Sequence, residues 1–231
     1  NIVAINMSLG GDNYNYKTYE SLYSSLEKAG IAIVVATGNS FNKYETAGIA
    51  NPANIKGTIA VSAVFGETYP INYTLRGTSW GEKNSEYSIN DTIQPFQENS
   101  FYIDIFPVDA GEIAPWAQRA AGLVDVLAPG AWITSAKDQS SLTNNSLYID
   151  LEGTSMAAPV IAGSIALFQQ VANEYIGRNL TISEIRNLIS KTSTNIFDGN
   201  NEYSSADIKP TQANYNLINI HELAKEIKNL A

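Results

Sequence analysis

The first part of the chain alternates between strand-like and helix-like patterns, and this alternation constrains the fold more than any other feature. Residues 1–7 are mostly apolar, as in a strand, while residues 17–29 carry apolar side chains at helical spacing, followed by Gly30 as a stop signal. Residues 31–36 are continuously apolar, which is typical of a strand covered on both faces of a parallel sheet. Strand, helix and strand in this order make a βαβ unit, and residues 58–64 read as a third strand. The sequence therefore predicts an α/β fold with a mainly parallel sheet flanked by helices.

Size and composition restrict the class of protein. A chain of 231 residues suits one large domain, and we expect residues 1–231 to form a single domain. A net charge of −9 argues against a nucleic-acid partner, because phosphate binding needs clustered Lys and Arg. No apolar run approaches the roughly 18 residues that span a bilayer, and no signal peptide is visible. The absence of cysteine excludes disulfides, a cysteine nucleophile and Cys-ligated zinc.

The segment Gly-Thr-Ser-Met-Ala-Ala-Pro at 153–159 leads into a small, apolar run at 160–167. This run predicts a buried helix of roughly four to five turns, with Ser155 at its N-terminal end. The first N–H groups of a helix have no intrahelical partner and its dipole is positive there, so an oxygen that becomes negative is favoured at this place. Ser155 could be a nucleophile or simply an N-cap, which is the commonest role of a serine before an apolar helix.

A second motif follows the predicted strand at 31–36. Thr-Gly-Asn-Ser occupies 37–40, and functional groups gather at the carboxyl ends of strands in open parallel sheets. The amide of Asn39 could donate to a developing oxyanion there, or Gly38 and Asn39 could simply form a turn. Ser-Leu-Gly-Gly at 8–11 ends the first strand in the same way.

Together these motifs resemble the subtilisin-like serine proteases. Residues 153–159 resemble the nucleophile segment of that family, Asn39 resembles its oxyanion-hole residue, and residues 8–10 resemble its substrate-binding strand end. Residues 51–64, 125–130 and 214–220 resemble further family segments, and all occur in family order. The resemblance implies a three-layer subtilisin-like fold whose N-terminal strands are missing from this chain.

The resemblance also implies roles for particular residues. Ser155 would be the catalytic nucleophile, with Asn39 and the Ser155 N–H holding the oxyanion of an acyl-transfer reaction on peptide or protein substrates. Substrate-binding residues would be Ser8, Leu9 and Gly10, which pair with the substrate backbone, and Ala36, Thr37 and Gly38, which wall the side-chain pocket. We expect a secreted or cell-surface protein. No cofactor is assigned, structural calcium is suggested by the resemblance alone, and no metal-ligand cluster is visible.

The family segments that carry the catalytic Asp and His are absent from the sequence. A serine hydroxyl needs a hydrogen-bonded base, normally a histidine oriented by a carboxylate. The single histidine, His221, lies in an amphipathic pattern and is expected to be a surface residue. One hypothesis is therefore a protease whose Asp and His come from an upstream segment or separate chain. The alternative is a catalytically inactive scaffold that binds partners; the intact pairing of Ser155 with Asn39 favours the first. An esterase is a third and more distant hypothesis.

Two further expectations concern the shape of the molecule. Residues 66–118 form a long excursion rich in Tyr, Asn, Glu and Ser, in which residues 101–106 suggest a hairpin, and we expect a surface elaboration. A sheet that lacks its first strands would expose an apolar edge, so residues 1–231 alone are expected to be poorly soluble or unstable.

Overall fold

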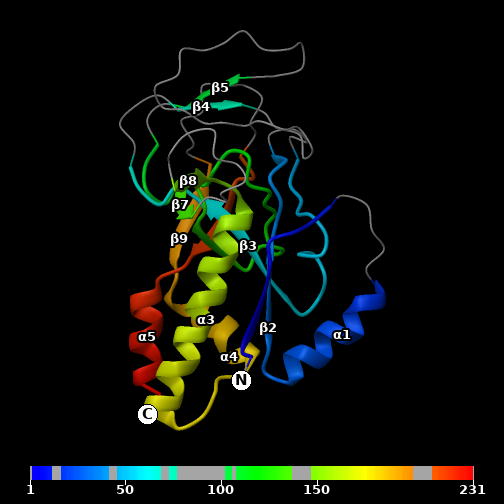
Figure 1. Cartoon of the computed structure of the whole chain (residues 1–231), viewed down its shortest axis with the longest axis vertical. Coiled ribbons are helices and arrows are strands. Elements are labelled where there is room, and N and C mark those ends of the chain that lie inside the picture. The colour runs from blue at the N-terminus through cyan, green and yellow to red at the C-terminus, as the bar shows by residue number, and fades with distance from the viewer. Residues whose placement is uncertain are drawn as a thin grey trace.

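The computed structural model describes residues 2–11, 17–41, 46–68, 73–76, 102–105, 108–136, 147–199 and 210–230. The main strands are β1 (Ala4–Met7), β2 (Ala32–Ala36), β3 (Thr58–Val64), β6 (Val126–Pro129), β9 (Thr194–Asp198) and β10 (Ala213–Leu217). They form a six-stranded sheet in the order β1-β2-β3-β6-β10-β9 (Figure 1). Neighbours from β1 to β10 run parallel, and β9 alone pairs antiparallel, with β10. The predicted α/β fold with a mainly parallel sheet is confirmed.

Helices cover both faces of the sheet. They are α1 (Lys17–Lys28), α3 (Thr154–Ile176), α4 (Ile182–Thr192) and α5 (Ile220–Lys228). All residues of β2 and β3 are buried. Because side chains alternate along a strand, Val34 packs in the core cluster that contains α3, α4 and α5, whereas Ile33 packs in the cluster that contains Tyr23 of α1. This gives three layers, and it explains the continuous apolar run of β2.

Helix α3 is longer than predicted. It spans 23 residues, because Phe168 and Ala172 continue the buried face beyond the apolar run at 160–167. Among the described residues, α3 is the one helix that is long and apolar enough to cross a membrane, by length and composition only. The sequence contains no uninterrupted apolar run of that length, because polar residues interrupt the helix. In this fold it packs against β1, β2, β3 and β6, and Ile161, Ile165 and Phe168 are fully buried.

The C-terminal helices follow the sequence signals at their starts. Thr181 and Glu184 form a reciprocal capping box at the start of α4. Asn219 caps α5 through its side-chain oxygen, which accepts from the N–H of Glu222, and the preceding strand β10 ends at Leu217. The side chain of His221 is 86% exposed, so the expectation of a surface residue is confirmed.

The excursion at 66–118 is only partly described. Strands β4 (Tyr73–Arg76) and β5 (Tyr102–Ile105) form an antiparallel pair, while residues 69–72, 77–101 and 106–107 lie outside the described residues. From Val108 onward the chain returns to the core, where Ile113 and Trp116 are buried. This last part of the excursion is therefore interior structure rather than a surface elaboration.

One edge of the main sheet is open among the described residues. Strand β1 pairs with β2 on one side, and no described strand pairs with its other side. Ile2 and Ile5 are 70% and 37% exposed at this edge. An exposed apolar edge strand is a ready template for pairing with another strand.

Candidate active site

Ser155 lies inside helix α3 rather than at its cap. Gly153 is the N-cap residue and the helix begins at Thr154, so Ser155 is the second helical residue. The antiparallel pair of β7 (Ile133–Ala136) and β8 (Tyr148–Leu151) precedes this helix start in the chain. The N–H of Ser155 belongs to the first turn, whose donors have no partner within the helix. The interpretation of Ser155 as a simple N-cap is therefore wrong, since the N-cap is Gly153. Ser155 places its hydroxyl beside its own N–H donor in the first turn.

Asn39 follows β2 and is fixed against the start of α3. Its side-chain oxygen Oδ1 accepts hydrogen bonds from both the N–H and the hydroxyl of Thr154, each at 2.9 Å. Because a backbone N–H can only donate, the atom facing it must be the oxygen, and the orientation of the amide is determined. The Nδ2 group lies near Gly153, where an ideal Cβ on that glycine would come within 3.0 Å of it. Asn39 therefore presents an N–H donor beside the helix start that carries Ser155.

Thr154 joins the two segments. Its side chain is fully buried, and its hydroxyl oxygen accepts from the N–H of Gly38 at 3.0 Å while donating to Asn39. On the β1 side, the hydroxyl of Ser8 donates to the carbonyl oxygen of Ser155 at 2.6 Å. The carboxyl ends of β1 and β2 and the start of α3 thus meet in one place, as expected for an open parallel sheet.

Gly130, directly after β6, allows the loop that precedes Ser155 to approach the sheet closely. The N–H of Gly153 donates to the carbonyl oxygen of Gly130 at 2.8 Å. A Cβ at Gly130 would lie 2.8 Å from both the carbonyl oxygen of Gly153 and the Cβ of Ala63. No side chain fits there without displacing the segment that precedes Ser155.

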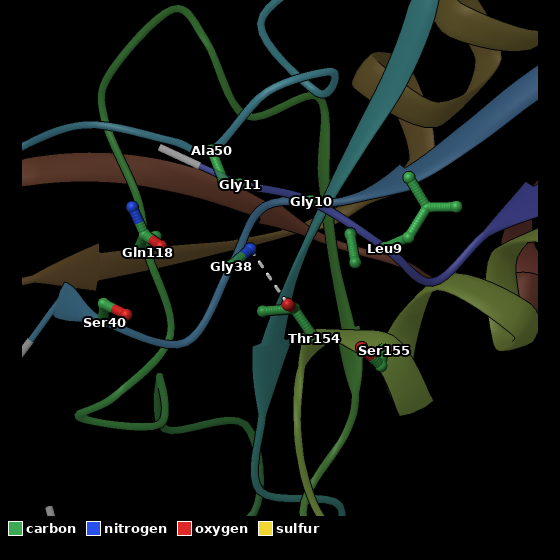
Figure 2. Close-up of a pocket in the computed structure, with 10 residues that line it drawn as sticks. Leu9, Gly10, Gly11, Gly38, Ser40, Ala50, Gln118, Thr154 and Ser155 are labelled. Atoms are coloured by element: carbon green, nitrogen blue, oxygen red, sulfur yellow. Dashed lines mark hydrogen bonds between the residues drawn. The ribbon is translucent and has the colours of Figure 1, made fainter. Parts of the chain in front are cut away.

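A cavity of about 150 Å³ opens beside Ser155 (Figure 2). Its lining consists of Leu9, Gly10, Gly11, Ala36, Gly38, Ser40, Ala50, Gln118, Thr154 and Ser155. Among the predicted substrate-binding residues, the structure brings Leu9, Gly10, Ala36 and Gly38 together around this cavity. Ser8 instead contacts the backbone of Ser155, and Thr37 is fully buried outside the lining.

Five lining residues were not predicted to be site residues. They are Gly11, Ser40, Ala50, Gln118 and Thr154. Ala50 and Gln118 reach the cavity through long-range backbone pairing, since Ala50 N–H donates to Thr37 and Gln118 N–H donates to Gly38. No local pattern in the sequence signals such pairing.

A buried ion pair supports the wall that carries Gln118. Arg119 and Asp198 are both fully buried, and the guanidinium donates to the two carboxylate oxygens at 2.7 and 3.1 Å. Thr211 adds hydrogen bonds to Asp198 from its N–H and hydroxyl. Burial alone would raise the pKa of Asp198, but the hydrogen bonds and charge of Arg119 hold this pKa below its ordinary value.

The described lining contains no titratable group that could act as a general base. The only histidine of the sequence, His221, is exposed on α5 and faces Glu222 at 4.0 Å. Within the described residues, no group of three or more His, Cys, Asp or Glu side chains could hold a metal ion. What this chain supplies is a serine hydroxyl with two oriented N–H donors beside a cavity.

Comparisons with known proteins identify relatives among the serine proteases. The serine protease AprX of Bacillus subtilis (strain 168) is 29% identical over 198 residues, which cover 80% of this chain and 36% of that protein. Subtilisin DY of Bacillus licheniformis is 27% identical over 197 residues, covering 84% of this chain and 50% of that protein. The chain thus spans half or less of the length of these relatives.

Structural similarity extends over almost the whole chain. A solved protease structure from Pseudoalteromonas arctica PAMC 21717 matches with a TM-score of 0.60 at 21% identity, covering 97% of this chain and 51% of that one. At this identity the likeness shows the fold, which is that of a subtilisin-like protein. The Subtilase family profile matches residues 1–208. The chain therefore belongs to the subtilase family.

Proposed function

We propose that this chain carries the nucleophile part of a serine endopeptidase. The observation that supports it is the pairing of Ser155 with Asn39, whose amide oxygen is fully engaged by Thr154 so that its N–H group is directed as a donor. A binding scaffold has no evident need for a serine hydroxyl and an oriented amide donor at the same helix start. The catalytic Asp and His come from an upstream segment or a separate chain.

The reaction is peptide-bond hydrolysis through an acyl-enzyme. The Oγ of Ser155 attacks the scissile carbonyl carbon, and its proton passes to the histidine supplied by the other segment. Asn39 Nδ2 and the Ser155 N–H hold the oxyanion. When the tetrahedral intermediate collapses, the C–N bond breaks and the amine leaves with that proton. Water then attacks the acyl group, releasing the acid and restoring Ser155.

The substrate lies along the end of β1. Leu9 and Gly10 are exposed and line the cavity, so an extended peptide can pair there as an added strand. Its side chain before the scissile bond enters the cavity walled by Ala36 and Gly38. Ser8 and Thr37 hold these walls: Ser8 contacts Ser155, and Thr37 pairs through its backbone with Val61 and Ala50.

Two accompanying proposals rest on the family alone. The protein is secreted or at the cell surface, which cell fractionation of the source organism would test. Structural calcium is the one cofactor that the family suggests, and the described residues assign no group to it.

The test is fluorophosphonate labelling of the natively isolated protein, with mass spectrometry of the labelled peptide and of every chain present. We expect label on Ser155 and a co-purifying segment that carries Asp and His. Ser155→Ala removes the label, and Asn39→Ala keeps Ser155 but slows peptide hydrolysis. Absence of label despite a bound Asp- and His-bearing partner would favour the inactive scaffold. Hydrolysis of small esters without peptides would favour an esterase.

A further inference from the structure

The cavity beside Ser155 is lined by a buried side-chain amide that has no hydrogen-bond partner among the described residues. Gln118 is 8% exposed and its side chain lines the cavity. Neither its carboxamide oxygen nor its carboxamide nitrogen makes a hydrogen bond to the described residues, whereas its backbone is fully used. A buried amide normally has partners, so an unpaired one facing a cavity indicates a place for a ligand group.

The position of this amide is fixed by its surroundings. The N–H of Gln118 donates to Gly38 at 2.9 Å, and its carbonyl oxygen accepts from the hydroxyl of Ser62 at 3.0 Å. The next residue, Arg119, is held by the buried pair with Asp198. The carboxamide lies against Gly38, where a Cβ would come within 2.1 Å of Oε1. The backbone and the neighbouring side chains therefore pre-position the amide.

The amide lies at the far end of the cavity from the nucleophile. In Figure 2, Gln118 and Ser40 lie on the side away from Ser155, and Gly38 lies between this pair and Ser155. A peptide whose scissile carbonyl is at Ser155 thus directs its preceding side chain toward Gln118. Ser40, which is 7% exposed, adds a hydroxyl to the same end.

The chemistry of this end selects among side chains. No charged side chain contributes to the described lining, so a Lys, Arg, Asp or Glu side chain would be buried there without a counter-charge. An apolar side chain would cover the Gln118 amide and leave it unpaired, which is costly. A carboxamide both donates and accepts, so it can pair with another neutral polar group. A cavity of about 150 Å³ admits a group up to the size of an aromatic ring.

We propose that Gln118 makes this pocket selective for a substrate residue, directly before the scissile bond, whose side chain ends in a neutral hydrogen-bonding group, such as Gln or Tyr. This inference rests on the proposed function of Ser155. It names the substrate class of that same site.

The experiment compares peptide p-nitroanilides that differ only in the residue before the cleaved bond, using the complete protease with its Asp- and His-bearing segment. We expect kcat/KM to favour Gln over Met and Tyr over Phe by about 3- to 10-fold, the worth of one net hydrogen bond. Gln118→Met should bring both ratios close to one. Gln118→Glu should raise cleavage after Lys and Arg, because it places a carboxylate at the end of the cavity away from Ser155. Asn187→Leu, an amide replacement at an exposed position on α4, should leave both ratios unchanged.

Fluorophosphonate labelling separates this inference from the proposed function, because the probe carries no side chain for the pocket. If Ser155 is labelled and peptides are cleaved, but the wild-type ratios are near one or survive in Gln118→Met, the inference is wrong and the function stands. If neither labelling nor hydrolysis occurs, the proposed function fails and the inference fails with it. Labelling of Gln118→Met also shows that this variant is folded.

Discussion

The hydroxyl of Thr154 makes two hydrogen bonds at the centre of the site. It accepts from the N–H of Gly38 and donates to Oδ1 of Asn39. Neither bond involves the Ser155 hydroxyl, so under the proposed function Thr154 is a positioning residue for Asn39. The sequence motif contained Thr154 but gave no reason to separate its role from that of Ser155.

Thr154→Val should lower kcat by roughly tenfold with little change in KM. The valine keeps the shape of the threonine but leaves the half-buried N–H of Gly38 unpaired and Asn39 less firmly held, at a cost of about 1–3 kcal/mol. Thr154→Ser retains the hydroxyl and should retain most of the rate. Steady-state kinetics of the complete protease measures both.

Asn39→Ala provides the control for this prediction. In a subtilisin, a relative of this chain, losing one oxyanion donor costs about 10²–10³ in kcat, and the same scale is expected here. Thr154→Val should add almost nothing in the Asn39→Ala background, because it acts through Asn39. Full additivity of the two losses would contradict the positioning role.

At the scale of the elements, the sequence predicted what depends on local pattern. The apolar runs located β2 and β3, and the helical spacing of apolar residues located α1. It could not predict β9, because this strand has an exposed, polar pattern and exists through antiparallel pairing with β10. Gln118 was not predicted either, because its position beside Gly38 depends on a backbone hydrogen bond between segments that are distant in the sequence.

The turn after β6 has a steric requirement that a single methyl group can test. Gly130→Ala should reduce kcat and the rate of Ser155 labelling by tenfold or more, because its Cβ would meet the Gly153 carbonyl oxygen and Ala63 at 2.8 Å. Gly48→Ala is the matched control, since a Cβ there has no heavy atom within 4 Å. Equal labelling rates for the two variants would show that the loop before Ser155 tolerates the displacement.

The ion pair between β9 and the pocket wall makes stability depend on pH. The folded pKa of Asp198 lies below the ordinary value of 3.8, so its contribution to the free energy of unfolding is present above that value and disappears as the pH falls through the folded pKa. Asp198→Asn leaves Arg119 buried without its counter-charge and should lower the free energy of unfolding near neutral pH by about 3–5 kcal/mol.

Denaturant unfolding of the complete protease between pH 7 and pH 3 would measure this effect, with Ser155→Ala present to prevent self-digestion. The wild type should lose stability toward the acid end more steeply than Asp198→Asn. Parallel curves for the two proteins would mean that Asp198 contributes no pH-dependent stability.

At the scale of the whole molecule, the open edge of the main sheet lies next to the proposed catalytic serine. Ile2, before β1, and Ile5, within β1, are exposed at this edge, and Ser8, directly after β1, contacts Ser155. A segment that pairs with the free side of β1 would therefore cover apolar surface and bring its own carboxyl end to the site. Under the proposed function, one docking event would supply both a strand partner for β1 and the histidine base.

Residues 1–231 expressed alone should consequently aggregate or melt with low cooperativity, and co-expression with the Asp- and His-bearing segment should give a monodisperse complex with a sharp thermal transition.

The variant Ile5→Lys distinguishes edge pairing from general instability, because a charged side chain on an edge strand discourages pairing. This variant should make the isolated chain more soluble, yet weaken its assembly with the other segment and reduce Ser155 labelling in the mixture. Size-exclusion chromatography and calorimetry measure the outcome. A monomeric, cooperative melt of the wild-type chain alone would show that this edge needs no partner, and the base would then have to reach Ser155 by another route.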